Sequence, residues 1–451
     1  MIASVLVDVK AKEVDRTFDY LVPAILEHVI EVGQRVKVQF GPRLIMGYVL
    51  ELKDKSEYDK LKSIKEIIDI MPSLTPELIS LGKELAISNT FPLVSIYQAM
   101  LPSALKSKYH KKFKCLDTSL LSLELALKFD KFSELEDTKE LLPYLSEIKK
   151  NIINGTIEVQ YIVKQSGSGR FIKKLKLIDK NAKVRGTNQS KIMDYLMEFG
   201  ESDKRDVLRV SGASYQSVKR LVELKIIEEF SIERYREVDS IYGVNDKTVI
   251  LNKEQEYVFN EINSKLNTHE IFLLHGITGS GKTEIYLNII EEVINQGKEA
   301  IMLVPEISLT PMMVARFKGR FSDKVALLHS ALSKGEKYDE WRKVKRKEVQ
   351  VVVGARSAIF APFENLGVII IDEEHTDSYK QVDSPSYHAK DVAIVRSKNY
   401  NIPLILGSAT PSIESYYKSL NKEYTLLEMN HRANNTKLQQ VYIEEMRFEF
   451  K

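Results

Sequence analysis

Apart from its hydrophobic core, the sequence has little that could stabilise a fold. Cys115 is the only cysteine in 451 residues, which excludes an internal disulfide framework and a cysteine-rich zinc site within this chain. No apolar run approaches the roughly 18–20 residues that a membrane span requires, so an integral membrane protein is excluded. The N-terminal residues also lack the apolar core and small-residue cleavage site of a signal peptide. These absences favour a cytoplasmic protein with no membrane partner.

Net charge is nearly absent as well. The 66 basic and 63 acidic residues leave +3, so the whole-chain charge says little about nucleic acid. Two local clusters are more informative: residues 106–114 hold five lysines and a histidine without an acid, and residues 164–185 hold eight basic residues and one acid. Cations at this density can neutralise phosphates, although a solvated loop explains either cluster equally well.

The first hundred residues predict a small β-rich domain. Apolar and polar residues alternate over residues 1–70 as they do in strands, with glycines and a proline between the runs. Residues 76–100 then change to helical spacing. We expect a small β-barrel or sheet followed by helices, within a domain that covers residues 1–105.

The pattern that follows predicts three helices and a pair of strands. Helices are expected from Asn188 to Phe199, from Ser202 to Gly212, and after Ser214 as a cap, and the stretch IEEFSIERYREV favours a terminal hairpin. This order is typical of a winged helix-turn-helix, although a generic three-helix module has similar spacing. We expect a linker plus winged-helix domain over residues 106–240, and residues 118–180 are too mixed to place.

Two cations on the third of these helices are candidate DNA ligands. Lys219 and Arg220 stand one turn after Gln216. A helix of this kind can enter a groove or lie along the phosphates. Phosphate contact is the expected role, because phosphates are present whatever the base sequence.

From about residue 241 short β-branched runs recur, each followed by polar residues and a helical segment. The runs cover residues 271–274, 300–304, 325–328, 349–353, 367–371 and 403–406. Continuous apolar runs of this length fit strands buried on both faces of a parallel sheet. Ligands of such sheets bind beyond the carboxyl ends of the strands, where the polar residues stand.

A phosphate-binding loop is the strongest chemical signal. Residues 276–283 are GITGSGKT, a complete G-x-x-x-x-G-K-T between a strand and a helix. Backbone N–H groups of such a loop surround phosphate oxygens, Lys282 reaches the β- and γ-phosphates, and the Thr283 hydroxyl binds Mg²⁺. The expected ATP-binding residues of the loop are Gly276, Thr278, Gly279, Ser280, Gly281, Lys282 and Thr283. The expected cofactors are therefore ATP and Mg²⁺.

An acidic motif, DEEH, begins at Asp372 directly after the run GVIII. Asp372 is expected to bind Mg²⁺, and Glu373 to orient and polarise the attacking water. A solvated acidic turn is the alternative for such a motif by itself. The expected catalytic residues are thus Lys282, Asp372 and Glu373.

Four further residues are expected to serve the same edge of the sheet. Ser408 and Thr410 of the tripeptide SAT can hydrogen-bond the acidic motif and relay the nucleotide state to DNA. Gln255, about 20 residues before the loop, offers a donor and an acceptor that match an adenine edge, unless it only begins a surface helix. Arg356, in the strand-end segment GARS, can hold a DNA backbone.

Taken in order, these motifs resemble superfamily 2 helicases, and most closely the PriA family of replication-restart helicases. The phrases that carry the resemblance are LHGITGSGKTEIY, LVPEISLTP, HSALSKGE, VVGARSAIFAPF, IIDEEHTDSYKQ, YHAKDVA and LGSATPSIES. Near the N-terminus, RTFDYLVP and VKVQFG resemble the domain by which that family binds the 3′ end of a nascent DNA strand. The resemblance covers the chain from end to end and is weakest over residues 115–240.

The resemblance implies a fold and several site residues. The fold class is multidomain α/β: the β-rich domain, the winged helix, and a first RecA-like P-loop lobe over residues 241–451. Tyr379, Lys380 and Tyr387 resemble the aromatic-rich loop by which related helicases sense single-stranded DNA, and the tyrosines would stack on bases; two ordinary loop tyrosines are the alternative. The residues that resemble the family's pocket for a DNA 3′ end are Phe18, Asp19, Tyr20, Gly41 and Lys62.

Within that pocket, Asp19 would accept a hydrogen bond from the terminal hydroxyl, an aromatic neighbour would stack on the last base, and Lys62 would pair with a phosphate. Ordinary strand core is the alternative for the aromatic residues.

A PriA protein continues beyond its first motor lobe into a zinc-binding insertion, a second RecA-like lobe and a C-terminal domain, whereas this sequence stops at Lys451. We therefore expect a fragment that binds DNA and ATP without efficient turnover. Zinc is expected only in the missing part.

The function implied is an ATP-dependent 3′–5′ DNA helicase that recognises stalled or abandoned replication forks and starts primosome assembly. Its partners would be forked and single-stranded DNA, primosome proteins and the single-stranded DNA-binding protein. A fork-binding module without turnover and an unrelated P-loop ATPase are the alternatives. The pairing of DEEH with SAT favours the helicase.

Overall fold

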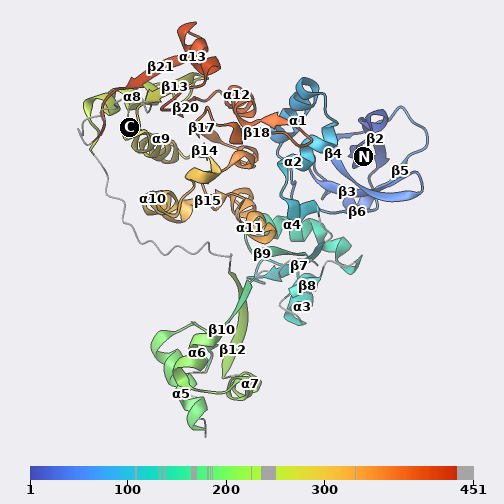
Figure 1. Cartoon of the computed structure of the whole chain (residues 1–451). Helices are drawn as coiled ribbons and strands as arrows, with labels where there is room; N and C mark the ends of the chain where they lie inside the picture. The colour runs from blue at the N-terminus through green and yellow to red at the C-terminus, as the bar shows by residue number, and fades with distance from the viewer. Residues whose placement is uncertain are drawn as a thin grey trace, which may run out of the picture.

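The computed structural model places the β-rich N-terminal segment beside a large parallel sheet (Figure 1). The described residues are 1–106, 109–131, 134–136, 139–163, 170–179, 182, 184, 186–224, 226–234, 250–330 and 332–433. The unit formed by residues 170–234 lies below the rest of the molecule in this view. None of the helices in the described ranges is long and apolar enough to cross a bilayer.

Six short strands of the N-terminal segment form one curled sheet. They are β1 (Ile2–Val7), β2 (Thr17–Leu21), β3 (Arg35–Phe40), β4 (Arg43–Lys53), β5 (Lys62–Ser63) and β6 (Glu66–Ile67). Their order is β5-β2-β1-β4-β3-β6, so the two edge strands are consecutive in the chain. The two edge strands are joined by residues 64 and 65, and between them the Lys65 amide donates to the Lys37 carbonyl of β3 at 2.9 Å. Buried Val5, Val36 and Val49 line the inner face, and the expected small β-barrel or sheet is confirmed.

Two helices, α1 (Pro76–Asn89) and α2 (Leu93–Met100), connect this barrel to the parallel-sheet lobe. Thr75 caps α1 by accepting a hydrogen bond from the Leu78 amide, and Pro76 occupies the first turn. The helices share one hydrophobic core with Tyr48 on the outer face of the barrel and with residues of the lobe. The helical spacing predicted these helices, but it gave no sign that their apolar side chains pack against the lobe.

A buried arginine joins α1 to the lobe. Arg396 lies on α12 (Ala389–Tyr400) and is fully buried. Its Nε and Nη2 donate to the two carboxylate oxygens of Glu77 on α1, at 3.1 and 2.9 Å. Its Nη1 donates to the carbonyls of Ile359 and Ala361. A buried guanidinium satisfied on both sides in this way holds α1 in one position on the lobe.

Replacing Arg396 with alanine is expected to lower the free energy of unfolding by about 3 kcal/mol, because it leaves the Glu77 carboxylate and two buried carbonyls without donors. Urea unfolding followed by the fluorescence of Trp341 would measure the loss, since this residue is the only tryptophan in the sequence and belongs to the same core. The double variant with Glu77→Ala should recover part of the stability. A loss below about 1 kcal/mol would contradict the role assigned to Arg396.

A second small sheet follows the barrel in the chain. Its strands are β7 (Tyr109–Cys115), β8 (Glu134–Glu136) and β9 (Ile157–Val163) in the order β8-β7-β9, with helices α3 (Leu123–Lys131) and α4 (Leu145–Ile153). Buried Phe113, Leu125 and Ile148 belong to the same hydrophobic cluster as the barrel interior. The hydrophobic packing therefore continues across the boundary that the sequence suggested at residue 105.

The next unit contains the three expected helices. They are α5 (Thr187–Phe199), α6 (Lys204–Ser211) and α7 (Tyr215–Glu223), and Ser214 caps α7 by accepting a hydrogen bond from the Ser217 amide. The sheet order is β11 (Ser202–Asp203), β10 (Arg170–Leu177) and β12 (Ile227–Arg234). These helices and strands pack around their own small core.

The expected terminal hairpin of this unit is wrong. Strand β12 pairs along its whole length with β10, which precedes the three helices, from Arg170–Arg234 to Leu177–Ile227. The second half of the predicted hairpin falls partly on residues 235–238, outside the described residues. The wing is thus a ribbon closed by strands from the two ends of the unit.

The lobe is built on seven parallel strands. They are β13 (Ile271–Gly276), β14 (Glu299–Leu303), β15 (Val325–Leu328), β16 (Val351–Gly354), β17 (Leu366–Asp372), β20 (Leu404–Ser408) and β21 (Thr425–Met429). Their order is β15-β16-β14-β17-β20-β13-β21, and every pairing is parallel. The six apolar runs all became strands. The seventh strand, β21, was missed because its sequence TLLEM contains polar residues.

Helices cover both faces of this sheet. They are α8 (Lys253–Asn263), α9 (Lys282–Asn295), α10 (Pro311–Phe321), α11 (Lys334–Lys345), α12 and α13 (Ile413–Leu420). Helices α8, α9 and α10 share a core with one face, and α11 and α12 share the other core with α1 and α2. The carboxyl ends of the strands remain as the edge where loops can hold a ligand.

Candidate functional site

The phosphate-binding loop lies at this edge, between β13 and α9. Strand β20 pairs with β13 on one side and with β17 on the other, so the loop, the acidic motif and SAT follow three adjacent strands. In a parallel sheet the carboxyl ends of neighbouring strands meet at one edge. The structure therefore brings together three motifs that lie up to about 130 residues apart in the chain.

The loop has the backbone of an anion-binding turn. Gly279 and Gly281 have φ values of 82° and 89°, which side chains rarely adopt. A Cβ on Gly281 would also lie 2.2 Å from the Gln255 amide nitrogen. The Lys282 ammonium, 9% exposed, donates to the Gly276 carbonyl at 2.7 Å, and the buried Ser280 hydroxyl has no partner among the described residues. The helix dipole of α9 adds partial positive charge at the same point.

Gln255 supports this loop from α8. Its side-chain oxygen completes a capping box with Asn252, and its nitrogen donates to the Ser280 carbonyl at 3.0 Å. The side chain is 3% exposed, so holding the loop is the role that the geometry shows. Its expected contact with an adenine edge stays a prediction.

Asp372 ends β17 beside the loop. The Tyr286 hydroxyl, from α9, donates to its carboxylate at 3.1 Å, and the Tyr379 hydroxyl donates to its carbonyl at 2.6 Å. Burial and the adjacent charge of Glu373 raise the pKa of Asp372, while Tyr286 and Lys282 act against this. A partly buried carboxylate that would gain from a cation, close to the loop that carries the Thr283 hydroxyl, fits an Mg²⁺ ion.

Glu373 stands in a strained turn directly after β17. Its φ is 47°, and its side chain is 33% exposed, with one carboxylate oxygen 3.6 Å from His375 Nδ1. An accessible carboxylate on a fixed backbone beside Asp372 can orient a water molecule. The expected division between a metal carboxylate and a water-orienting carboxylate is therefore compatible with the geometry.

Glu374 is a functional residue that the sequence did not single out. It is 1% exposed, and its oxygens accept hydrogen bonds from Lys390 Nζ at 2.9 Å and from the Ser412 amide at 2.7 Å. The hydroxyls of Ser412 and Ser415 donate to it at 3.0 and 2.9 Å. Burial raises the pKa of Glu374, but these donors outweigh it and hold the pKa below its ordinary value. Through these hydrogen bonds Glu374 connects the acidic motif to the start of α13, the helix that follows SAT.

A Glu374→Gln variant is expected to be less stable than the unmodified protein at neutral pH, because the charge-assisted bonds to Lys390 and Ser412 are weakened. The folded pKa of Glu374 is depressed, so its contribution is complete above the unfolded value near 4.5 and is lost as the pH falls through the folded value. Thermal unfolding of both proteins at several pH values would measure this. The two melting temperatures should converge below about pH 4.5, and a constant gap would contradict the assignment.

The acidic motif and SAT also make direct contact. His375 Nδ1 lies 2.8 Å from the Ser408 hydroxyl, which accepts a hydrogen bond from the Thr410 amide at 3.0 Å. The predicted hydrogen bond between the two motifs is present, with His375 as its partner on the acidic side. The expected relay of the nucleotide state to DNA stays a prediction.

The expected base-stacking role of Tyr379 and Tyr387 is wrong for this structure. Tyr379 is 1% exposed and Tyr387 6%, with the Tyr387 ring packed edge-on against Phe360 at 5.0 Å. They lie in one hydrophobic cluster with residues of α12, and this burial leaves no free ring face for a base. Lys380 remains exposed, and its carbonyl accepts a hydrogen bond from Arg356 at 2.6 Å. Arg356, from the segment GARS, thus lies beside Lys380, and the expected DNA contact of Arg356 stays a prediction.

The structure also divides the expected pocket for a 3′ end. Side chains alternate along β2, so Asp19 lies on the face opposite to Phe18 and Tyr20. Asp19 accepts hydrogen bonds from Ser4 and Ser56 and pairs with Lys53. Burial raises the pKa of Asp19, but these partners outweigh it and lower the pKa overall. The single pocket that the sequence suggested stays a prediction, and β alternation places its carboxylate and its aromatic side chains on opposite faces of β2.

The remaining residues of that set do lie together. Lys62 pairs with Tyr20 in the sheet register, and its ammonium lies 3.4 Å from the Gly41 carbonyl. Phe18 packs edge-on against Phe40 at 5.1 Å, next to Gly41. Gly41 has a φ of 55° and open space where a Cβ would point. One rim of the barrel therefore carries a ring, a lysine and exposed backbone.

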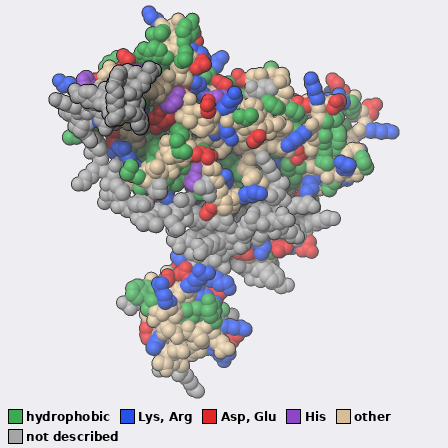
Figure 2. All heavy atoms as spheres, in the orientation of Figure 1, with side chains coloured by type: hydrophobic (Ala, Val, Ile, Leu, Met, Phe, Trp, Pro, Cys, Tyr) green, Lys and Arg blue, Asp and Glu red, His purple; other side chains and the backbone are tan. Residues whose placement is uncertain are grey.

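The winged-helix unit presents its cations to solvent. Lys219 and Arg220 are exposed on α7, and Arg220 forms a surface ion pair with Glu223 at 3.2 Å. Figure 2 shows Lys and Arg side chains on several sides of this unit. Such an ion pair contributes little to stability, so both cations can turn to a phosphate.

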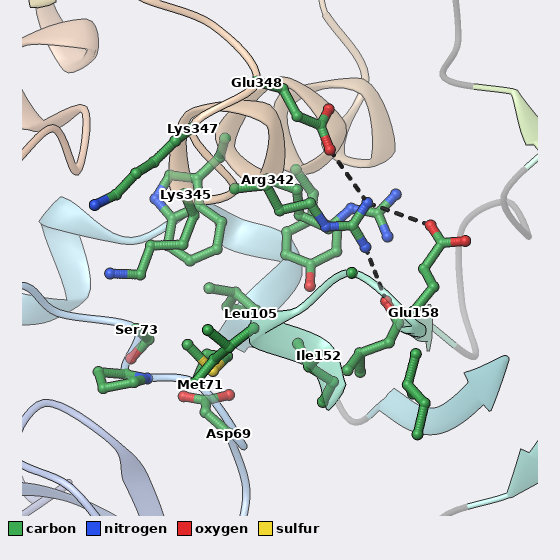
Figure 3. A pocket seen from close by; sticks show the side chains of 18 of the residues that line it. Asp69, Met71, Ser73, Leu105, Ile152, Glu158, Arg342, Lys345, Lys347 and Glu348 are labelled. Atoms are coloured by element: carbon green, nitrogen blue, oxygen red, sulfur yellow. Dashed lines mark hydrogen bonds and ion pairs between the residues drawn. The ribbon is translucent and has the colours of Figure 1, made fainter. Parts of the chain in front are cut away.

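A separate cavity of about 820 Å³ lies where the barrel, β9 and α11 meet (Figure 3). Arg346 crosses it to reach Glu158 at 3.3 Å and the Val159 carbonyl at 3.2 Å, and it also approaches Glu348. Lys345 and Lys347 pair with Glu364. Because these cations pair with carboxylates of the chain, the residues around the cavity hold parts of the molecule together. The cavity lies apart from the phosphate-binding loop.

Comparison with known proteins gives two family matches. Residues 4–102 match the 3′DNA-binding domain of PriA, and residues 248–413 match the family described as the res subunit of type III restriction enzymes. The first covers the barrel with α1 and α2, and the second covers the phosphate-binding loop, the acidic motif and SAT.

Relatives extend the similarity to the whole chain. The replication restart protein PriA of Bacillus subtilis is 42% identical over 100% of this chain and 58% of its own length. The protein of the same name from Haemophilus influenzae is 33% identical over 93% of this chain and 51% of its own length. That from Synechocystis is 30% identical over 100% and 57%. The chain thus spans a little over half the length of these relatives.

Proposed function

The chain is related along its whole length to the replication restart proteins named PriA, and on that premise we propose that it is the DNA- and nucleotide-binding part of an ATP-driven DNA helicase that acts at replication forks. The observation that carries the proposal is the convergence of three motifs at one edge of the sheet. A phosphate-binding loop, a strand-end carboxylate pair and a hydroxyl tripeptide meet there, in a chain that also matches a 3′DNA-binding domain.

In this proposal each residue has a distinct role toward ATP. Lys282 and the loop amides would bind the phosphates, and Thr283 and Asp372 would hold Mg²⁺, which would neutralise phosphate charge. Glu373 orients the water, and His375 carries the change to Ser408 and Thr410. Gln255 keeps the loop closed around the phosphates.

DNA would be held by cations on several elements. Arg356 and Lys380 lie beside the acidic motif, and Lys219 and Arg220 lie on the winged helix. Each makes phosphate contacts that do not depend on sequence, as recognition of forks requires. The rim with Phe18, Gly41 and Lys62 is the place for a DNA 3′ end, and the match of residues 4–102 supports this.

Finer properties belong to the proposal and rest on the resemblance alone. They are 3′–5′ movement, recognition of stalled or abandoned forks, and the start of primosome assembly with primosome proteins and the single-stranded DNA-binding protein. The zinc-binding region and the second motor lobe would belong to the length of the relatives that this chain does not span.

The proposal is tested by measuring ATP hydrolysis and fork binding by the chain, using forks whose nascent strand ends in a 3′-hydroxyl or a 3′-phosphate. We expect fork DNA to bind several-fold more tightly with the hydroxyl end and to raise hydrolysis. Tight fork binding without hydrolysis would indicate a DNA-binding module. Hydrolysis that ignores DNA would indicate an unrelated ATPase, and equal binding of both ends would contradict the 3′-end site.

A further inference from the structure

We propose that Arg432 is a nucleotide-binding residue whose guanidinium pairs with the phosphate chain of the nucleotide held by the loop at residues 276–283. This inference rests on the proposed function, because it takes that loop as the phosphate site. None of the sequence motifs includes Arg432, which lies just beyond β21.

The chain leaves β21 along the phosphate-binding loop. The Met429 carbonyl accepts a hydrogen bond from the Ile277 amide at 3.1 Å, and the Ala433 amide donates to the Gly279 carbonyl at 2.9 Å. Residues 429–433, which we call the strap, are therefore fixed to the loop at both ends. Arg432 lies between the two attachments.

A third attachment fixes the strap to α8. His431 Nδ1 lies 2.6 Å from one carboxylate oxygen of Glu254, and the His431 amide donates to the other at 3.2 Å. The next residue of α8 is Gln255, which donates to the Ser280 carbonyl. The loop is thus held between α8 and the strap, and Arg432 has a defined place beside it.

The position of Arg432 directs its charge to the loop. Its Cγ and Cδ lie 3.8 and 3.9 Å from the point that a Cβ on Gly279 would occupy, so the stem packs on the apex of the loop. Gly279 is also one of the loop residues with left-handed backbone. A Cβ at this position would make ordinary van der Waals contact with the arginine stem, so the stem lies directly against the loop backbone.

The guanidinium has no anionic partner in the part of the chain that the structure describes. Its Nε is buried and makes no hydrogen bond there, and no carboxylate of those residues forms an ion pair with it. Buried donors are nearly always satisfied, and a guanidinium is satisfied best by an anion with several oxygens. The loop beside it is built for phosphate, so the phosphate chain of a nucleotide is the anion that this place admits.

The test is the affinity of the complete chain for ADP, measured by calorimetry, for the unmodified protein and for Arg432→Ala, Arg432→Lys, Lys282→Ala and Lys398→Ala. Lys398 is an exposed lysine near the end of α12, where the chain turns back to the amino edge of the sheet, so it controls for loss of one charge. We expect Arg432→Ala to weaken ADP binding about tenfold and Arg432→Lys to weaken it less. Lys398→Ala should change nothing, and the loss at Arg432 should shrink as salt concentration rises.

The outcomes separate this inference from the proposed function. If Lys282→Ala loses ADP binding and Arg432→Ala keeps it, the role of Arg432 is wrong and the phosphate site stands. If the unmodified chain does not bind ADP, both fail. If Arg432→Lys is as weak as Arg432→Ala at every salt concentration, the side chain acts by stacking or by shape, and pairing with phosphate is overturned.

Discussion

Replacing Glu373 with glutamine is expected to lower ATP turnover by about 10²–10⁴-fold while leaving nucleotide affinity unchanged. Glutamine keeps the shape of the side chain but removes the carboxylate that orients and polarises water. Binding should survive because Lys282, Thr283 and Asp372 remain. Glu373 directly follows Asp372, in a turn whose φ at Glu373 is 47°. Glu374, the adjacent candidate, is fully engaged by Lys390 and two serines.

Two quantities are measured. The first is DNA-stimulated ATP hydrolysis, in a protein as long as the curated relatives. The second is the affinity of this chain for ADP. Asp377→Asn is the matched control, because it removes an exposed carboxylate from the same loop. A Glu373→Gln variant that loses ADP affinity as strongly as turnover would show that Glu373 acts on the metal. The proposed division of roles between Asp372 and Glu373 would then be wrong.

Replacing Lys282 with alanine is expected to lower turnover by about 10²–10³-fold and to weaken nucleotide binding as well. The ammonium is buried at the loop, where its donation to the Gly276 carbonyl keeps it in place for the phosphates. Fork binding should persist, because the DNA contacts proposed for the barrel rim and α7 lie on other elements. ADP calorimetry and fork binding by the same preparation would check both expectations.

Lys265→Ala controls for this change, since Lys265 is exposed just after α8. Normal hydrolysis by Lys282→Ala would show that residues 276–283 are not the phosphate site. Loss of fork binding together with ADP binding would instead place the DNA contacts on the lobe.

The sequence by itself determined the parts of this protein that depend on local rules. The apolar runs became strands of the parallel sheet, because a strand buried on both faces must be apolar at every position. Ser214 capped α7, because a cap acts on an amide within the next turn. The loop at residues 276–283 took the expected place between β13 and α9, because its glycines and its helix start are encoded side by side.

Tertiary structure alone decided which residues meet across the chain. Strand β12 pairs with β10, which lies about 60 residues earlier in the chain. The periodicity within one segment carries no information on such a distant partner. The apolar residues of 109–159 joined the barrel core for the same reason. Tyr379 and Tyr387 are equally compatible with a loop and with a core, and only packing in the hydrophobic core of the lobe buried them.

The same limit applies to individual charges. In the motif DEEH the sequence shows two adjacent glutamates and no sign of how they differ. The strained turn leaves Glu373 accessible, and it directs Glu374 to Lys390 and the start of α13. Asp19 and its aromatic neighbours were separated by the alternation of β2 once the sheet fixed which face is inside. Contact partners are set by the fold as a whole, and the strap that places Arg432 over the loop became visible only there.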